Sequence, residues 1–193
     1  MNRLIPFVLA LILAAPAAAQ NLPRVPPPEQ HDGAHDFDFL LGDWKAHVKR
    51  LPDRLVGSTA WIEYDGVSNH HPVLGSAANF EEFEVDSPNA PKGAVKHIRA
   101  QTLRLYNPTS HQWSIYGVDV DAGTMDLPAV VGAFHDGVGE FYNQQDWKGR
   151  MVLVRYQWSH KGPNDALMQQ AFSLDGGKTW EVNWICELAR QKP

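Results

Sequence analysis

Short runs of β-branched and aromatic residues, separated by glycine, proline, asparagine and aspartate, dominate this chain from residue 37 onward. Runs of this kind favour strands joined by tight turns, and almost no segment shows the apolar period of a helix. Strands are expected near residues 44–51, 59–65, 78–85, 96–106, 112–119, 129–135, 139–145, 151–159, 166–174 and 179–188. An antiparallel sheet of this size leaves unpaired edges unless it closes. We therefore predict an all-β fold, a single antiparallel up-and-down β-barrel of about ten strands.

Two segments are expected before the folded domain, a signal peptide and an extended tail. Residues 1–19 have the pattern of a signal peptide, with Arg3 before a short apolar run and small residues up to Ala19. Cleavage after Ala19 is expected, which predicts a periplasmic or secreted protein. Residues 20–36 are expected to form an extended tail rich in proline and histidine, and residues 37–190 the barrel domain.

Composition narrows the classes of partner. The net charge is −5 at pH 7, and the basic residues are scattered, so we predict no nucleic-acid partner. No apolar stretch after the signal peptide is long enough to span a membrane as a helix. The single cysteine, Cys186, excludes an internal disulfide and is expected to be a small buried apolar side chain. The oligomeric state is left open.

Alternation along three expected strands predicts which side chains face the barrel interior. In 151–159 the apolar set includes Tyr156 and Trp158, and in 112–119 Trp113 shares a face with Ile115. In 166–174 the more apolar face also carries Gln170, a polar group among apolar neighbours.

Three motifs carry a family resemblance. They are FDFLLGDW at 37–44, WSIYGVD at 113–119 and a run at 173–184 that contains SLDGGKTWEVNW, and the run 130–142 also matches. In these motifs the chain resembles an uncharacterised bacterial family, a domain of unknown function with an FDFL-G-W start and an S-DGG-TWE-NW end. The resemblance covers about residues 36–190. It implies a calycin (lipocalin-like) barrel and brings no established activity.

Two details follow from that resemblance. In lipocalins the tryptophan that follows the first glycine packs against an arginine near the chain end, which implies a cation–π contact between Trp44 and Arg190. Relatives tend to have tryptophan where this chain has Gly117, so an inward-facing Gly117 would imply a wider cavity at that point.

Residues 173–180 also fit the Asp-box pattern S-x-D-x-G-x-T-W, which recurs once per blade in β-propeller sialidases. The pattern occurs once here, and the chain is too short for a propeller. We therefore predict a hairpin turn in which Asp175 caps the loop, the glycines take positive φ and Trp180 packs.

Histidines raise the question of a metal site, but their spacing does not support one. His70 and His71 are adjacent and so point to opposite faces of a strand, while His31 and His35 lie in the expected tail. The last expected strand, 179–188, contains no histidine that would bind haem. We predict no metal, haem or other cofactor.

Acidic residues are mostly expected on solvated faces and in loops, including the cluster Glu81, Glu82 and Glu84. Glu63 is the exception, because it shares a face with Trp61 and is expected inside the barrel. There it would anchor a ligand or act as a general base, with Arg104 as its expected partner.

Three hypotheses remain open. The preferred one is an exported barrel that binds a small apolar or aromatic molecule in its cavity. The alternatives are a barrel enzyme of the isomerase, cyclase or hydratase type, tested first at Glu63, and an envelope interaction module with a filled barrel. Catalytic residues are left unassigned. The expected ligand contacts are Glu63, Arg104, Trp113, Tyr156, Trp158, Gln170 and Trp184.

Overall fold

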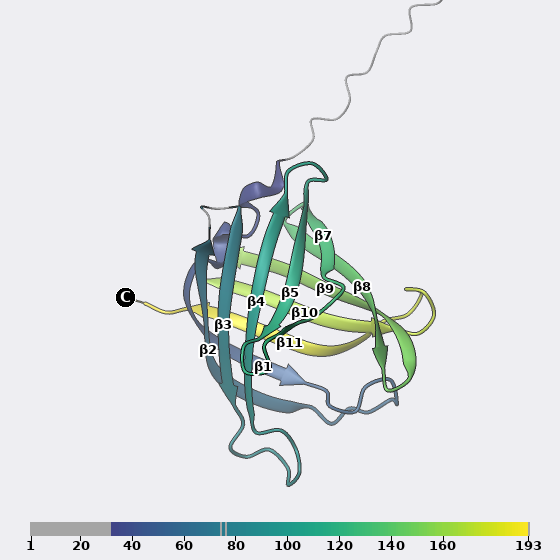
Figure 1. Cartoon of the computed structure of the whole chain (residues 1–193). Coiled ribbons are helices and arrows are strands. Elements are labelled where there is room, and N and C mark those ends of the chain that lie inside the picture. The colour runs from purple at the N-terminus through teal and green to yellow at the C-terminus, as the bar shows by residue number, and fades with distance from the viewer. Residues whose placement is uncertain (1–31, 74, 76, 193) are drawn as a thin grey trace, which may run out of the picture. The chain divides into compact units, whose positions relative to one another are not determined.

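Consecutive strands pair antiparallel around a closed barrel (Figure 1). The computed structural model describes residues 32–73, 75 and 77–192; the expected signal peptide and residues 20–31 of the expected tail lie outside them. Within the described residues the strands are β1 (Gly42–Arg50), β2 (Ile62–Val73), β3 (Ala78–Asp86), β4 (His97–Asn107), β5 (Gln112–Asp119), β6 (Thr124–Met125), β7 (Val130–His135), β8 (Val138–Trp147), β9 (Arg150–Gly162), β10 (Asp165–Ser173) and β11 (Glu181–Arg190).

The sheet order is β4-β3-β2-β1-β11-β10-β9-β8-β7-β5-β6, and the additional pairing of β4 with β5 closes the ring. The two-residue strand β6 pairs only with the end of β5 and stands outside the ring. The prediction of an all-β, up-and-down barrel of about ten strands is confirmed. Within the described residues no helix has the length and apolar character needed to cross a membrane.

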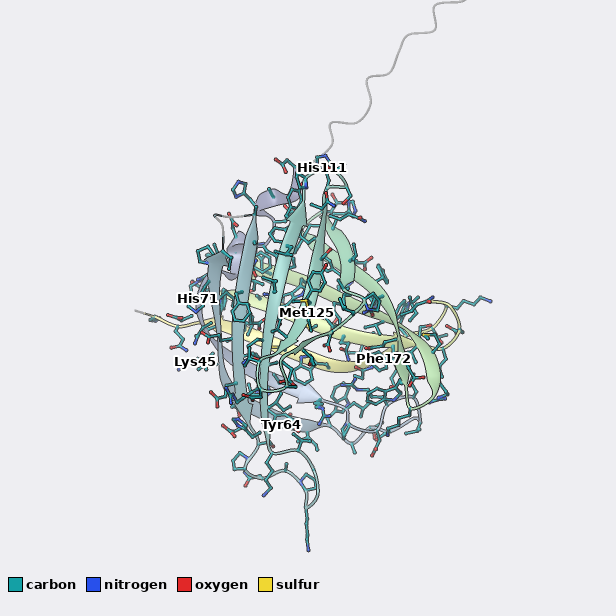
Figure 2. All side chains as sticks on the ribbon, viewed as in Figure 1. Lys45, Tyr64, His71, His111, Met125 and Phe172 are labelled. Carbon is teal, nitrogen blue, oxygen red and sulfur yellow. The ribbon has the colours of Figure 1, made fainter. Side chains whose placement is uncertain are left out.

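The meander gives the barrel two different ends. β1 begins and β11 finishes at one end, because Trp44 pairs with Arg190 and Arg50 pairs with Trp184. The turns β2–β3, β4–β5, β7–β8 and β9–β10 lie at this same end. Figure 2 shows His111, in the β4–β5 turn, beside the two short 3₁₀ helices there. The longer loops 51–61, 87–96 and 120–129 lie at the opposite end.

The first end is closed by the residues before β1. They form two 3₁₀ turns, η1 (Gly33–His35) and η2 (Asp38–Leu40). Between them Phe37 is fully buried, with its ring centroid 5.1 Å from that of Trp113 and 5.0 Å from that of Phe134. Residues 32–36 belong to the segment expected to be an extended tail, but they lie against the barrel, held by these aromatic contacts and by the hydrogen bond from Trp113 Nε1 to the Gly33 carbonyl (2.8 Å).

The residues that close this end, 32–41, are called the plug below. Arg190, the last residue of β11, joins the plug to that strand. Its guanidinium carbon lies 4.1 Å from the Trp44 ring centroid, so the cation–π contact implied by the family resemblance is confirmed. The same guanidinium donates hydrogen bonds to the Leu41 carbonyl (2.8 Å) and the Phe39 carbonyl (2.7 Å). One side chain thus satisfies one carbonyl group inside η2 and one directly after it, neither of which belongs to a strand.

The Ser173–Trp180 turn between β10 and β11 follows the prediction. The Asp175 carboxylate accepts hydrogen bonds from the Thr179 backbone N–H (2.9 Å), the Thr179 hydroxyl (2.7 Å) and the Ser173 hydroxyl (2.8 Å). Gly176 and Gly177 have φ of 71° and 88°, a region that side chains with Cβ rarely adopt. The pattern therefore builds a turn.

Candidate functional site

The barrel encloses a cavity of about 260 Å³ between the aromatic plug and the open end. Its walls are Arg54, from the loop after β1, and inward-facing residues of β3, β4, β5, β9, β10 and β11, which alternate with outward-facing neighbours as strand geometry requires. Trp158 and six further apolar residues form most of the wall: Phe83, Ala100, Ile115, Met168, Trp184 and Cys186. Six polar residues also line it: Arg54, Glu81, Thr102, Arg104, Tyr156 and Gln170.

Five of the seven expected ligand contacts line this cavity. They are Arg104, Tyr156, Trp158, Gln170 and Trp184. The predicted interior faces of β9 and β10 are correct, since Tyr156, Trp158 and Gln170 all reach the cavity. The cavity itself argues against a filled barrel, because that hypothesis required a solid core.

Trp113 packs against the plug. It is 1% exposed and inward-facing, as predicted. Its ring contacts Phe37 and lies 5.5 Å from that of Tyr106, while its N–H is bonded to Gly33. These contacts place it beneath the cavity floor.

Glu63 lies on the outer surface, so the prediction that it faces inward is wrong. Its neighbours Ile62 and Tyr64 are buried, and the alternation of β2 therefore sends Glu63 outward. There it forms an exposed ion pair with Lys49, with 3.8 Å between Nζ and Oε1. The enzyme hypothesis tested at Glu63 fails at this residue.

Arg104 pairs with Glu81, and the expected pairing with Glu63 is also wrong. Glu81 was expected on a solvated face, but it is 7% exposed, and Arg104 is 1% exposed. Arg104 Nη2 donates to Glu81 Oε2 at 2.5 Å, and Arg104 Nη1 donates to Asn79 Oδ1 at 3.0 Å. A buried charge needs such a partner, because desolvating it alone is costly.

His70 and Ser68 complete a closed circuit of hydrogen bonds with this pair. Arg104 Nη1 donates to His70 Nδ1 (3.4 Å), His70 Nε2 is 2.9 Å from Ser68 Oγ, and Ser68 Oγ donates to Glu81 Oε1 (2.8 Å). The serine has one proton, and it goes to Glu81, so the network assigns the proton on His70 to Nε2. His70 is therefore neutral in the circuit.

The electrostatics agree with that assignment. Burial lowers the pKa of His70 to about 4, and the Arg104 charge also lowers it, although Glu81 opposes the shift. For Glu81, burial raises the pKa, but the charge of Arg104 and the further contacts outweigh burial and bring the pKa to about 2. The pair is ionised and the imidazole is neutral at pH 7.

Two buried N–H groups beside the cavity have no hydrogen-bond partner within the described chain. They are Arg104 Nε and Trp158 Nε1. The Arg104 guanidinium carbon lies 5.1 Å from the Trp158 ring centroid and 5.3 Å from that of Phe37, and these two centroids are 6.0 Å apart, so both rings contact the cation. The floor of the cavity is thus a cation held by one carboxylate and two aromatic rings.

At the open end of the cavity, Arg54 comes from the loop after β1. Its guanidinium carbon lies 4.8 Å from the Trp147 ring centroid and 4.9 Å from that of Phe172. Burial, and next the charge of Arg50, lower the pKa of Arg54 to about 10, so it remains charged at pH 7. Nearby, burial raises the pKa of the Tyr156 hydroxyl to about 12, so it remains protonated.

Gly117 does not widen the cavity. A Cβ at this position would come within 2.2 Å of Asp126 Oδ2, so the aspartate occupies the space that a side chain would fill. The Asp126 backbone N–H donates to the Gly117 carbonyl (2.8 Å), which ties the 120–129 loop to β5. The implied wider cavity is therefore wrong at Gly117.

Cys186 is buried, as predicted. Burial raises the pKa of its thiol far above the usual range, so it is not a thiolate nucleophile. The structure also shows no cluster of three histidine, cysteine or acidic side chains arranged for a metal ion among residues 32–73, 75 and 77–192. Glu81 is ionised and hydrogen-bonded, so the cavity offers polar groups that can bind a ligand. The pKa values of Glu81 and Tyr156 are both far from 7, the range that suits a general acid or base.

Sequence reasoning missed Ser68, His70, Asn79, Glu81 and Arg54. A signal existed for the first four, because Ser68 and His70 are in phase with Tyr64 in β2, and Asn79 and Glu81 are in phase with Val85 in β3. Counting polar residues within an apolar phase would have found them. No periodic signal marks Arg54, which lies in a loop.

Comparisons with known proteins identify the fold. A solved structure of the S-type phycobiliprotein lyase CPES from Guillardia theta is similar, with a TM-score of 0.56 and 10% sequence identity over 86% of this chain and 99% of that chain. No family model matches, and no curated protein matches. The chain is thus an antiparallel β-barrel that matches this lipocalin-like lyase in structure, with a polar circuit and an aromatic floor around its cavity.

Proposed function

We propose that the chain is a binding protein for a small, mainly apolar or aromatic molecule held in the barrel cavity. The cavity of about 260 Å³ carries this proposal, because apolar and aromatic walls surround a few polar groups that point to one space. At roughly 30 Å³ for each water-sized unit of volume, the cavity suits a ligand of on the order of ten non-hydrogen atoms.

The walls explain why such a ligand would bind. Trp158, Trp184, Ile115 and Met168 offer aromatic and aliphatic surface, and burying ligand surface against it contributes roughly 25 cal/mol per Å². Gln170 donates to Asn183 Oδ1 (2.7 Å), which fixes its amide beside the cavity. Polar groups held in this way orient a ligand and give specificity.

The proposal includes the family and the location expected from the sequence. The resemblance to the uncharacterised bacterial family supports a calycin barrel and contributes no substrate. The signal-peptide pattern in residues 1–19 supports export to the periplasm or the medium. The structural match at 10% identity supports the fold alone.

Native mass spectrometry of the protein purified from its own cells tests the proposal. The expected result is a protein of residues 20–193 with a small additional mass that disappears on denaturation. Ala100→Trp, which fills the cavity, should lose the additional mass, while Ala189→Trp on the exposed face of β11 should keep it.

An additional mass that survives in Ala100→Trp would place the ligand outside the cavity and contradict the proposal. A native mass equal to the denatured mass, in protein from both periplasm and medium, would also count against it. A mass that includes residues 1–19 would contradict export by cleavage after Ala19.

A further inference from the structure

We infer that the ligand carries one carboxylate, which Arg54 binds at the open end of the cavity while the apolar body lies against the aromatic floor. This inference rests on the proposed function and names the chemical class of the ligand. The first observation is that Arg54 is part of the cavity wall, although it comes from a loop.

The guanidinium of Arg54 is positioned but not neutralised. Its Nε donates to the Leu51 carbonyl at 3.3 Å, and the rings of Trp147 and Phe172 cover it. Among the described residues, no carboxylate forms an ion pair with it, and its two terminal nitrogens make no hydrogen bond. Two parallel donors are therefore available, which is the geometry that binds a carboxylate through both oxygens.

A second arginine next to Arg54 also favours an anion at this position. After burial, the largest influence on Arg54 is the repulsion from Arg50, at the end of β1 on the inward-facing phase of that strand. A half-buried cation beside a second cation gains from any anion placed between them. An exposed arginine would gain much less, because water already screens it.

The arginine at the floor of the cavity differs from Arg54 because it already has an ion-pair partner. Arg104 already has Glu81 as its ion-pair partner, so a second carboxylate at the floor would face an existing one. The floor instead presents the ring of Trp158, and the ring of Phe37 packs against Arg104 and Trp158 from the plug. An elongated ligand would therefore lie with its apolar body toward the floor and its charge toward Arg54.

Two other carboxylates limit the charge of the ligand. Glu181 Oε1 accepts the Leu55 backbone N–H at 2.6 Å, and Asp126 lies beside Gly117 and influences Tyr156. The charge of Glu181 also acts on Arg54 and offsets part of the repulsion from Arg50. A monoanion such as a carboxylate fits that balance better than a phosphate dianion.

Calorimetric titration with two matched probes tests the inference. Naphthalene-2-carboxylate and naphthalene-2-methanol have the same ring system and differ in charge. A charge-assisted hydrogen bond contributes enough for about a tenfold to hundredfold preference for the carboxylate. Arg54→Gln should remove this preference and Arg54→Lys should keep part of it. Arg155→Gln should leave it unchanged, because Arg155 lies over Trp180, 4.6 Å from its ring centroid, away from the cavity wall.

The outcomes separate this inference from the proposed function. Equal affinity for both probes, or a preference that survives in Arg54→Gln, overturns the carboxylate inference while the cavity still binds. No binding of either probe to the wild-type protein overturns both. Equal loss in Arg54→Gln and Arg155→Gln would mean a general surface-charge effect and would also overturn the inference.

Discussion

At the scale of single residues, the polar circuit of Ser68, His70, Glu81 and Arg104 distinguishes this barrel from a purely apolar one. Each member forms a hydrogen bond with the next, and the charged pair is buried on two adjacent strands, β3 and β4. A buried pair of this kind contributes little net stability, but removing one member leaves the other charge unpaired. The circuit therefore makes the interior of the barrel sensitive to single substitutions.

Arg104→Leu is expected to lower the free energy of unfolding by about 3–5 kcal/mol, because Glu81 would remain buried without its ion-pair partner. Urea denaturation measures this. The double variant Arg104→Leu/Glu81→Leu should recover part of the loss, whereas Arg99→Leu, at an ion pair on the exposed face, should change stability little. A single variant as stable as the wild type would contradict the assigned pairing.

His70 gives a second prediction, on pH. Its folded pKa of about 4 lies below the ordinary 6.5, so the unfolded chain binds more protons in that range. Stability from this group is therefore complete above pH 6.5 and is lost as the pH falls toward 4, by roughly 3 kcal/mol in total.

Unfolding free energies measured from pH 7 to pH 5 check the sign. His70→Gln should have a flatter profile than the wild type, because glutamine can replace the neutral imidazole in the circuit without titrating. His71→Gln, on the outer face beside Glu82, serves as the control. Identical profiles for the wild type and His70→Gln would show that His70 is not the titrating group.

At the scale of elements, the alternation of apolar and polar residues predicted the inward face of some strands correctly and misplaced residues on others. β9 and β10 carry apolar residues on one face, so Tyr156 and Gln170 were placed correctly. Glu63 was misplaced because it shares a face with Trp61, which is 37% exposed, and Glu81 was misplaced because a charged side chain was expected in water. The burial of Glu81 depends on Arg104 from β4, and no local pattern shows which strand brings that partner.

The plug is an element whose stability depends on one side chain. Arg190→Met should lower the free energy of unfolding by about 2–3 kcal/mol, because it removes hydrogen bonds to Leu41, Phe39 and Pro163 and the contact with Trp44. Hydrogen exchange should increase across residues 32–41.

Arg155→Met is the matched control for the plug, because Arg155 also lies over a tryptophan ring but on β9. Its exchange in residues 32–41 should equal that of the wild type. Unchanged protection of the plug in Arg190→Met would contradict the role given to Arg190.

At the scale of the whole molecule, the meander assigns different tasks to the two ends. Both terminal strands meet at the closed end, where the plug and Arg190 lie (Figure 1). The loop 51–61, which supplies Arg54, lies at the other end, beside the cavity. Under the proposed function, a ligand would enter at the end that carries these loops.

The most direct test of ligand binding in the cavity is methyl NMR of methionine-labelled protein titrated with naphthalene-2-methanol. Met168 lines the cavity, while Met125 and Met151 are exposed and serve as internal controls. We predict a saturable shift of the Met168 methyl signal with the other two unchanged. A Met168 signal that does not move up to millimolar probe, or equal shifts at all three methionines, would contradict the account.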